Sequence, residues 1–96
     1  MTRDDVLQTL SIFLDQEEQE YGIVRLGIFG SAARDELSDS SDVDIVVEIL
    51  KPDLLTLVGI KQDLEERLHR PVDIVRYRGS MNAFLKTRID LEAVYV

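Results

Sequence analysis

Two β-rich stretches, residues 23–29 and 43–49, enclose a polar segment that begins with Gly30-Ser31 and ends with Asp42-Val43-Asp44. Their Ile, Val, Leu and Phe content predicts a strand on each side. Gly30 permits backbone angles that are closed to other residues, and it lets an anion approach the main chain. The segment therefore predicts two strands joined through a tight turn and a closely spaced pair of acids.

The remaining periodicity predicts further helices and strands around this unit. A first helix should begin at a Thr2 cap and end near Gly22, and a short helix should span Ser31 to Asp35. A longer helix should open at Pro52-Asp53 and stop before Pro71. Its apolar positions recur on one face: Leu54, Leu57, Ile60, Leu64 and Leu68.

The C-terminal part of the chain predicts a third strand over residues 72–75, a helix from Gly79-Ser80 to about Ile89 and a short strand over residues 93–96. The order of elements predicts an α/β (α+β) fold, in which a small mixed β-sheet has helices packed against it. We expect residues 1–96 to form a single domain, because a chain of 96 residues has room for one modest core.

Charge and composition narrow the classes of partner. The formal net charge is −8 and no basic stripe is present, which argues against a nucleic-acid grip. An acidic site suits a free nucleotide with its metal ions, and an acidic surface suits a basic protein partner. The chain has no cysteine, no apolar run of membrane-spanning length and no signal-peptide core, so we expect it to be cytoplasmic.

Asp42 and Asp44 are two residues apart, so on a strand they point to the same face. Two adjacent carboxylates repel each other unless cations lie between them. Hard oxygen ligands favour Mg²⁺, with Mn²⁺ as the alternative. Two such ions, about 3.5–4 Å apart, are a common arrangement for moving a phosphate-linked group. We therefore predict that Asp42 and Asp44 hold metal.

Gly30 and Ser31 are predicted to bind the phosphates of a nucleotide. Free N–H groups at a helix start favour an anion, and the Ser31 hydroxyl adds a donor. The alternative is that Ser31 only caps the helix, and the two roles are compatible. Asp73 is the third candidate acid, because an unpaired charge in the apolar strand 72–75 would be costly. Its alternative is a solvent-facing position at a strand start.

The segment from Gly30-Ser31 to Asp42-Val43-Asp44 resembles the signature of DNA-polymerase-β-like nucleotidyltransferases. The small size is similar to that of the minimal nucleotidyltransferases (MNT type), which act as antitoxins beside HEPN-domain toxins. The resemblance implies catalytic roles for Asp42, Asp44 and Asp73. It also places Arg34 in the family's Gly-Ser-x-Ala-Arg pattern, where it steadies phosphate or pairs with an acid such as Glu36 or Asp42. Asp35 occupies a position at which relatives often carry glycine.

The resemblance implies Mg²⁺-dependent transfer of AMP from ATP to a tyrosine of a cognate HEPN ribonuclease toxin. Two alternatives stay open. In the first, the chain neutralises its HEPN partner by binding alone; in the second, it transfers a nucleotidyl group to a small molecule. The set of Gly30, Ser31, Asp42, Asp44 and Asp73 argues against the first. The lack of a second domain to hold such a substrate argues against the second.

Overall fold

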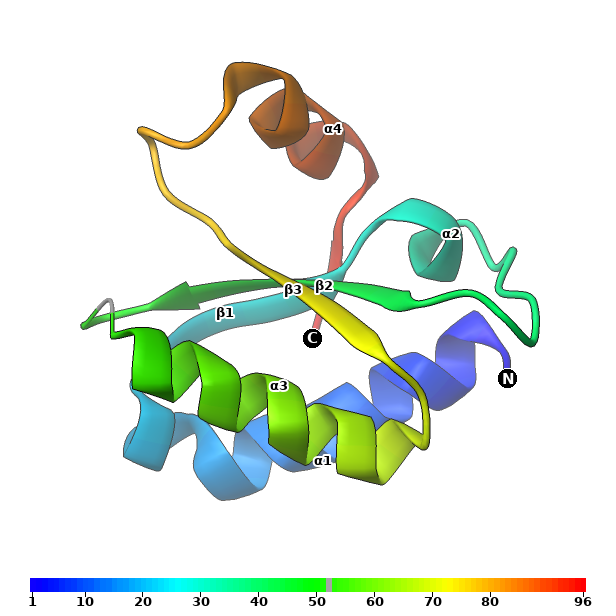
Figure 1. The fold of residues 1–96 in the computed structure, drawn as a ribbon, viewed down its shortest axis with the longest axis horizontal. Coiled ribbons are helices and arrows are strands. Elements are labelled where there is room, and N and C mark those ends of the chain that lie inside the picture. The colour runs from blue at the N-terminus through cyan, green and yellow to red at the C-terminus, as the bar shows by residue number, and fades with distance from the viewer. Residues whose placement is uncertain (52) are drawn as a thin grey trace.

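The computed structural model describes residues 1–51 and 53–96 as a four-stranded mixed sheet with helices on both faces (Figure 1). The elements follow in the order α1 (Arg3–Tyr21), β1 (Ile23–Ile28), α2 (Gly30–Ala33), β2 (Val43–Ile49), α3 (Leu54–Leu68), β3 (Val72–Arg76), α4 (Ala83–Glu92) and β4 (Val94–Tyr95). The α/β class expected from the sequence is confirmed.

The sheet has the strand order β3-β2-β1-β4. β1 pairs antiparallel with both β2 and β4, whereas β2 and β3 run parallel. A parallel pair needs a crossover connection, and α3 supplies it. The crossover matters for function, because it brings the starts of β2 and β3 to the same end of the sheet.

Helices α1 and α3 lie together against one face of the sheet, below it in Figure 1. The main core forms between them and the inward side of the strands, because apolar residues alternate along β2 and face this side. Fully buried members of this core are Phe13 in α1, Leu26 in β1, Ile45 in β2 and Leu64 in α3. This layer anchors the sheet and leaves its other face available for a site.

The opposite face carries α2 and α4 (Figure 1). A smaller apolar cluster forms there around Phe29, Val46 and Ile89, so that β2 is buried on both faces. Beyond this cluster the face is polar. Arg25 pairs with Glu48 at 2.9 Å and lies over the rings of Tyr77 and Tyr95.

Most predicted elements are confirmed, with three corrections. The helix expected over Ser31–Asp35 spans Gly30–Ala33. The last helix begins at Ala83 and not at Gly79-Ser80, because the Asn82 side chain accepts a hydrogen bond from the Leu85 amide and caps it there. Leu54, expected on the buried face of α3, is 74% exposed at the first turn. The predicted opening at Pro52 lies outside the described residues, and Asp53 caps α3.

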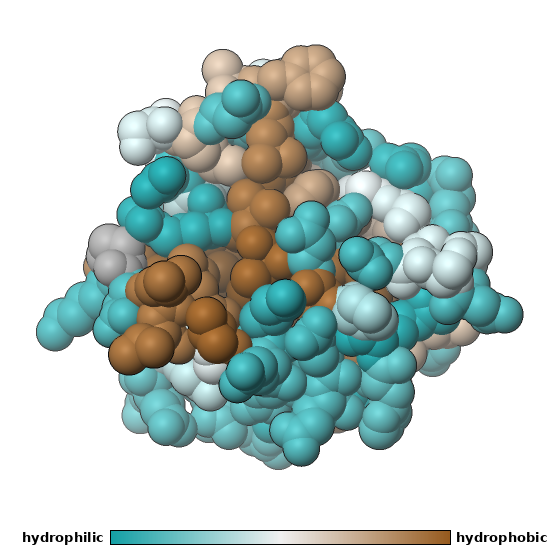
Figure 2. All heavy atoms as spheres, in the orientation of Figure 1, coloured by the Kyte–Doolittle hydropathy of each residue, from teal (hydrophilic) through white to brown (hydrophobic). Residues whose placement is uncertain are grey.

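Apolar side chains also gather on the surface along the edge of β3. Figure 2 shows them as a brown band that runs from α3 at the lower left across β3 to α4 at the top. Exposed members are Leu54, Leu55, Val58 and Phe84. None of the described helices is both long and apolar enough to cross a lipid bilayer.

Candidate active site

Asp44 and Asp73 lie side by side at the start of the parallel strands β2 and β3. They are register partners in the ladder, which places their side chains on the same face of the sheet. Neighbours Val43 and Val72 point the other way into the main core. Burial of these valines therefore fixes both carboxylates on the face that carries α2 and α4.

The surroundings of Asp44 disfavour the charged form of its carboxyl. Partial burial raises its pKa, and the negative charges of Asp73 and Asp42 raise it further. The positive charges of Arg88 and Arg34 act in the opposite direction. Asp42 is exposed just before β2, and Asp73 is exposed on β3. Asp44 is therefore the most buried of the three predicted acids, and it lies within electrostatic range of the other two.

Gly30 lies directly against this acid. Its φ of +63° is left-handed, and a Cβ at this position would collide with Oδ2 of Asp44. The Phe29 amide donates to the Asp44 carbonyl at 3.0 Å, which ties the end of β1 to the start of β2. Glycine is therefore required here both for the backbone conformation and for the space that the carboxylate occupies.

Ser31 is partly exposed in the first turn of α2. Because α2 has only four residues, its dipole is small, and the useful donors are the first-turn amides and the hydroxyl. Asp35 has a φ of +59°, which is a conformation that glycine adopts at no cost. The Asp35 carboxylate accepts from the Arg3 amide at 2.7 Å.

Arg34 makes two ion pairs, with Glu36 at 3.1 Å and with Glu92 at 2.5 Å. Glu36 was an expected partner, but Glu92 was not. Glu92 and Arg88 lie one turn apart near the end of α4 and pair at 3.6 Å. The sequence analysis missed both residues, although the i, i+4 spacing of opposite charges was a visible signal.

The donor set suits a hard divalent cation. Asp42, Asp44 and Asp73 supply carboxylate oxygens alone, and the repulsion at Asp44 is the condition that a cation would relieve. Within residues 1–51 and 53–96, no three acidic or histidine side chains converge as a ready-made cage. The arrangement is therefore an open carboxylate edge, of the kind that shares a metal with the phosphates of its substrate.

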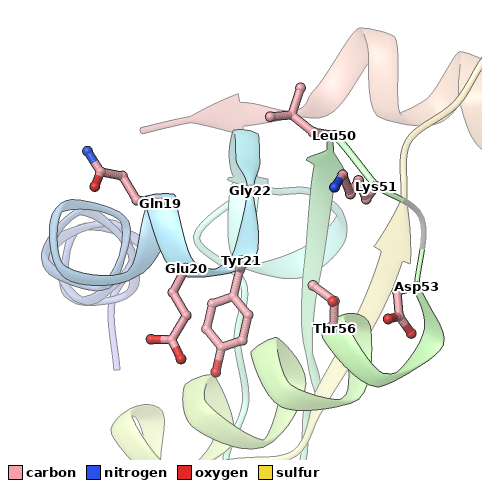
Figure 3. A pocket seen from close by; sticks show the side chains of 8 residues that line it. All are labelled: Gln19, Glu20, Tyr21, Gly22, Leu50, Lys51, Asp53 and Thr56. Carbon is pink, nitrogen blue, oxygen red and sulfur yellow. The ribbon is translucent and has the colours of Figure 1, made fainter.

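Two surface cavities lie away from these acids. One, of about 350 Å³, is lined by Tyr21, Gly22, Leu50, Lys51 and their neighbours, at the opposite end of β2 from Asp44 (Figure 3). The other, of about 360 Å³, lies beside the free edge of β3 and includes Leu57, Ile74 and Leu85. Neither contains Asp42, Asp44 or Asp73.

Comparison with known sequences finds relatives that are all described as nucleotidyltransferases or adenylyltransferases. The model of the family described as polymerase beta, nucleotidyltransferase matches residues 10–96. A provisionally named protein adenylyltransferase of Methanocaldococcus jannaschii is 46% identical over 78 residues, which is 80% of this chain and 83% of the relative. The protein adenylyltransferase MntA of Thermococcus cleftensis is 30% identical over 100% of this chain and 97% of its own length.

Solved structures agree. A protein provisionally described as a minimal nucleotidyltransferase superposes with a TM-score of 0.80 at 32% identity, covering 98% of this chain and 95% of that one. Two toxin–antitoxin complexes share the fold at lower identity. One contains AMP-PNP (TM-score 0.75, 21% identity, 92% and 69% covered). The other is tri-AMPylated Shewanella oneidensis HEPN toxin with MNT antitoxin (0.71, 19%, 97% and 70% covered).

The predicted resemblance to minimal nucleotidyltransferases is thereby confirmed. The family model covers nearly the whole chain, a relative matches it end to end, and a solved structure shares its fold. This chain belongs to the polymerase-β-like nucleotidyltransferase family, as one of its minimal members.

Proposed function

We propose that the chain transfers AMP from ATP to a tyrosine hydroxyl of a HEPN-domain toxin and so acts as its antitoxin. The observation that carries the proposal is the register pairing of Asp44 with Asp73, directly beside Gly30. The similarity to proteins named protein adenylyltransferases supports AMP as the transferred group. In the reaction, a bond forms between the tyrosine oxygen and the α-phosphorus. The bond from that phosphorus to the bridging oxygen breaks, and pyrophosphate leaves.

The residues divide this work between them. The turn at Gly30 and Ser31 would bind the phosphates, with Arg34 as a nearby positive charge. Asp42, Asp44 and Asp73 would hold Mg²⁺ or Mn²⁺, and two such ions would supply charge neutralisation at the triphosphate and at the attacking oxygen. Asp73 is the most accessible of the pair on β2 and β3, so we assign it to the side on which the acceptor arrives.

The surface supports a protein partner. The acidic charge of −8 suits a basic protein such as an RNA-directed toxin, and the apolar band beside β3 offers area for association (Figure 2). One of the structural neighbours is an MNT antitoxin in complex with a HEPN toxin, and another is a toxin–antitoxin complex with AMP-PNP. We propose a hetero-oligomer with a HEPN protein, ATP as the donor and no direct contact with nucleic acid.

Mass spectrometry of the partner tests this function. The protein encoded beside this chain should form a salt-sensitive complex with it and gain one or more AMP groups on tyrosine after incubation with ATP and Mg²⁺. A complex without an adduct would favour the antitoxin that acts by binding alone. The absence of any complex, or tight sequence-selective RNA binding by the isolated chain at physiological salt, would contradict the proposal.

Asp73 and Ser31 should affect different kinetic constants. Asp73→Asn should lower turnover far more than ATP affinity, because Asp73 lies on the acceptor side. Ser31→Ala should weaken triphosphate binding by about 1–2 kcal/mol, the range for a hydrogen bond to a charged group, with less effect on turnover. Steady-state kinetics with varied ATP, paired with direct nucleotide titration, measures both. A large loss of ATP binding in Asp73→Asn with turnover intact would refute the assignment.

A further inference from the structure

Glu92 places a shielded carboxylate between two arginines from different elements. Its side chain is 26% exposed near the end of α4. Oε1 accepts from Nη1 of Arg34 at 2.5 Å, and Oε2 lies 3.6 Å from Nη2 of Arg88. Within the described part of the chain, Oε2 is a buried oxygen without a hydrogen bond. Arg88 is therefore held in place by charge but is not fully engaged.

Both arginines come from the elements that cover the acidic face of the sheet. Arg34 follows α2 directly, one turn after Gly30, and Arg88 projects from the helix that covers the same face of the sheet. Their positive charges act on the Asp44 carboxyl and oppose the effect of Asp73 on its pKa. Lys86, the other cation on α4, is directed elsewhere, since it pairs with Asp90 and lies over the Tyr77 ring.

A nucleoside triphosphate is a polyanion that Asp42, Asp44 and Asp73 repel. Arginine is suited to receive it, because its planar fork binds phosphate oxygens in the same way as it binds a carboxylate. The Glu92 carboxylate already holds the Arg34 fork by a hydrogen bond and keeps the Arg88 guanidinium beside it by charge. We propose that Arg34 and Arg88 form a two-arginine clamp for the β- and γ-phosphates of the donor, and that Glu92 is the positioning residue of this clamp.

The clamp rests on the proposed function only in taking ATP as the donor. It gives Arg88 a role in binding that the signature segment does not contain. The competing explanation is that Glu92 only joins α2 to α4 as a structural ion pair. The two explanations differ in how binding depends on the number of phosphates, because a purely structural role would affect AMP and ATP alike.

Isothermal titration of the full chain with α,β-methylene-ATP and with AMP, both with Mg²⁺, distinguishes them. Arg88→Ala should weaken binding of the ATP analogue at least tenfold and leave AMP affinity within twofold. Arg88→Lys should recover part of the loss. Glu92→Gln should raise the KM for ATP several-fold with kcat nearly unchanged. Inorganic tripolyphosphate should displace the ATP analogue less well from Arg88→Ala and from Glu92→Gln than from the wild-type chain.

Lys86→Ala and Asp90→Asn are matched controls, because they remove the same charges from the same helix and the same i, i+4 geometry. They should leave both affinities unchanged. Equal losses for AMP and the ATP analogue in Arg88→Ala, an equal loss in Lys86→Ala, or no analogue binding by the wild-type chain would overturn the clamp. The titration needs no acceptor, so the clamp can hold even where AMP transfer to a partner fails.

Discussion

Replacing Asp44 with asparagine should lower the rate of AMP transfer at least about 100-fold. The substitution removes a negative charge that would hold the metal ions beside the reacting phosphate. Asp42→Asn should behave in the same way. The measurement is the rate of adduct formation on the partner at saturating ATP and Mg²⁺. Transfer at the wild-type rate by either variant would show that these acids are not the metal ligands.

The Asp44→Asn variant should fold and, when divalent metal is chelated, should be more stable than the wild-type chain. Burial and Asp73 raise the pKa of Asp44 above its ordinary value of 3.8, so ionising it costs folding free energy. Below 3.8 the carboxyl is protonated in both states and that cost is absent; it develops as pH rises through the folded-state pKa. In thermal unfolding with EDTA, the asparagine variant should have a higher Tm than wild type at pH 7, and this difference in Tm should disappear in acid.

Gly30→Ala should cost both activity and stability. The left-handed φ of +63° strains any residue with a Cβ, and the new methyl group would collide with Asp44 Oδ2. Together these effects should cost about 1–3 kcal/mol, which lowers Tm by roughly 5–15 °C for a domain of this size. Adduct formation should also fall sharply at temperatures where the variant is folded, because the displaced carboxylate no longer faces Asp73.

Gly79→Ala is the matched control for this substitution. A Cβ on Gly79 meets nothing within 4 Å, so unfolding free energy should change by less than about 0.5 kcal/mol. Circular dichroism melts and the adduct assay on both variants separate the local collision from a general loss of a glycine. A Gly30→Ala protein with wild-type Tm and rate would show that Asp44 can move aside freely.

Local patterns predicted the secondary structure well, because each pattern reflects contacts within a few residues. The Thr2 side chain caps α1 as expected and forms a capping box with Asp5. Ile45, Val46 and Val47 are fully buried, and an unbroken apolar run of this kind is typical of a strand covered on both faces. The start of α4 was wrong, because Gly79-Ser80 resembles a helix opening and only the capping bond from Asn82 decides the boundary.

The contacts of Arg34 could be predicted only in part from the segment between Gly30 and Asp44. Its two expected roles, phosphate contact or pairing with an acid, were equally open from the sequence. The ion pair with Glu36 is local and was foreseen, whereas the pair with Glu92 spans 58 residues. A contact at that separation depends on α4 packing back over the sheet, which no pattern near Arg34 encodes.

The sequence by itself determined the chemistry available: a glycine turn, two acids at i and i+2 and a third acid on a later strand, all fixed by short-range spacing. Only the tertiary structure decided which acids meet. Asp44 faces Asp73 because the crossover through α3 makes β2 and β3 parallel, and because Val43 and Val72 bury on the opposite side in that register. Long-range burial sets this register, so the joining of the acids with Arg88 and Glu92 is a property of the packed fold.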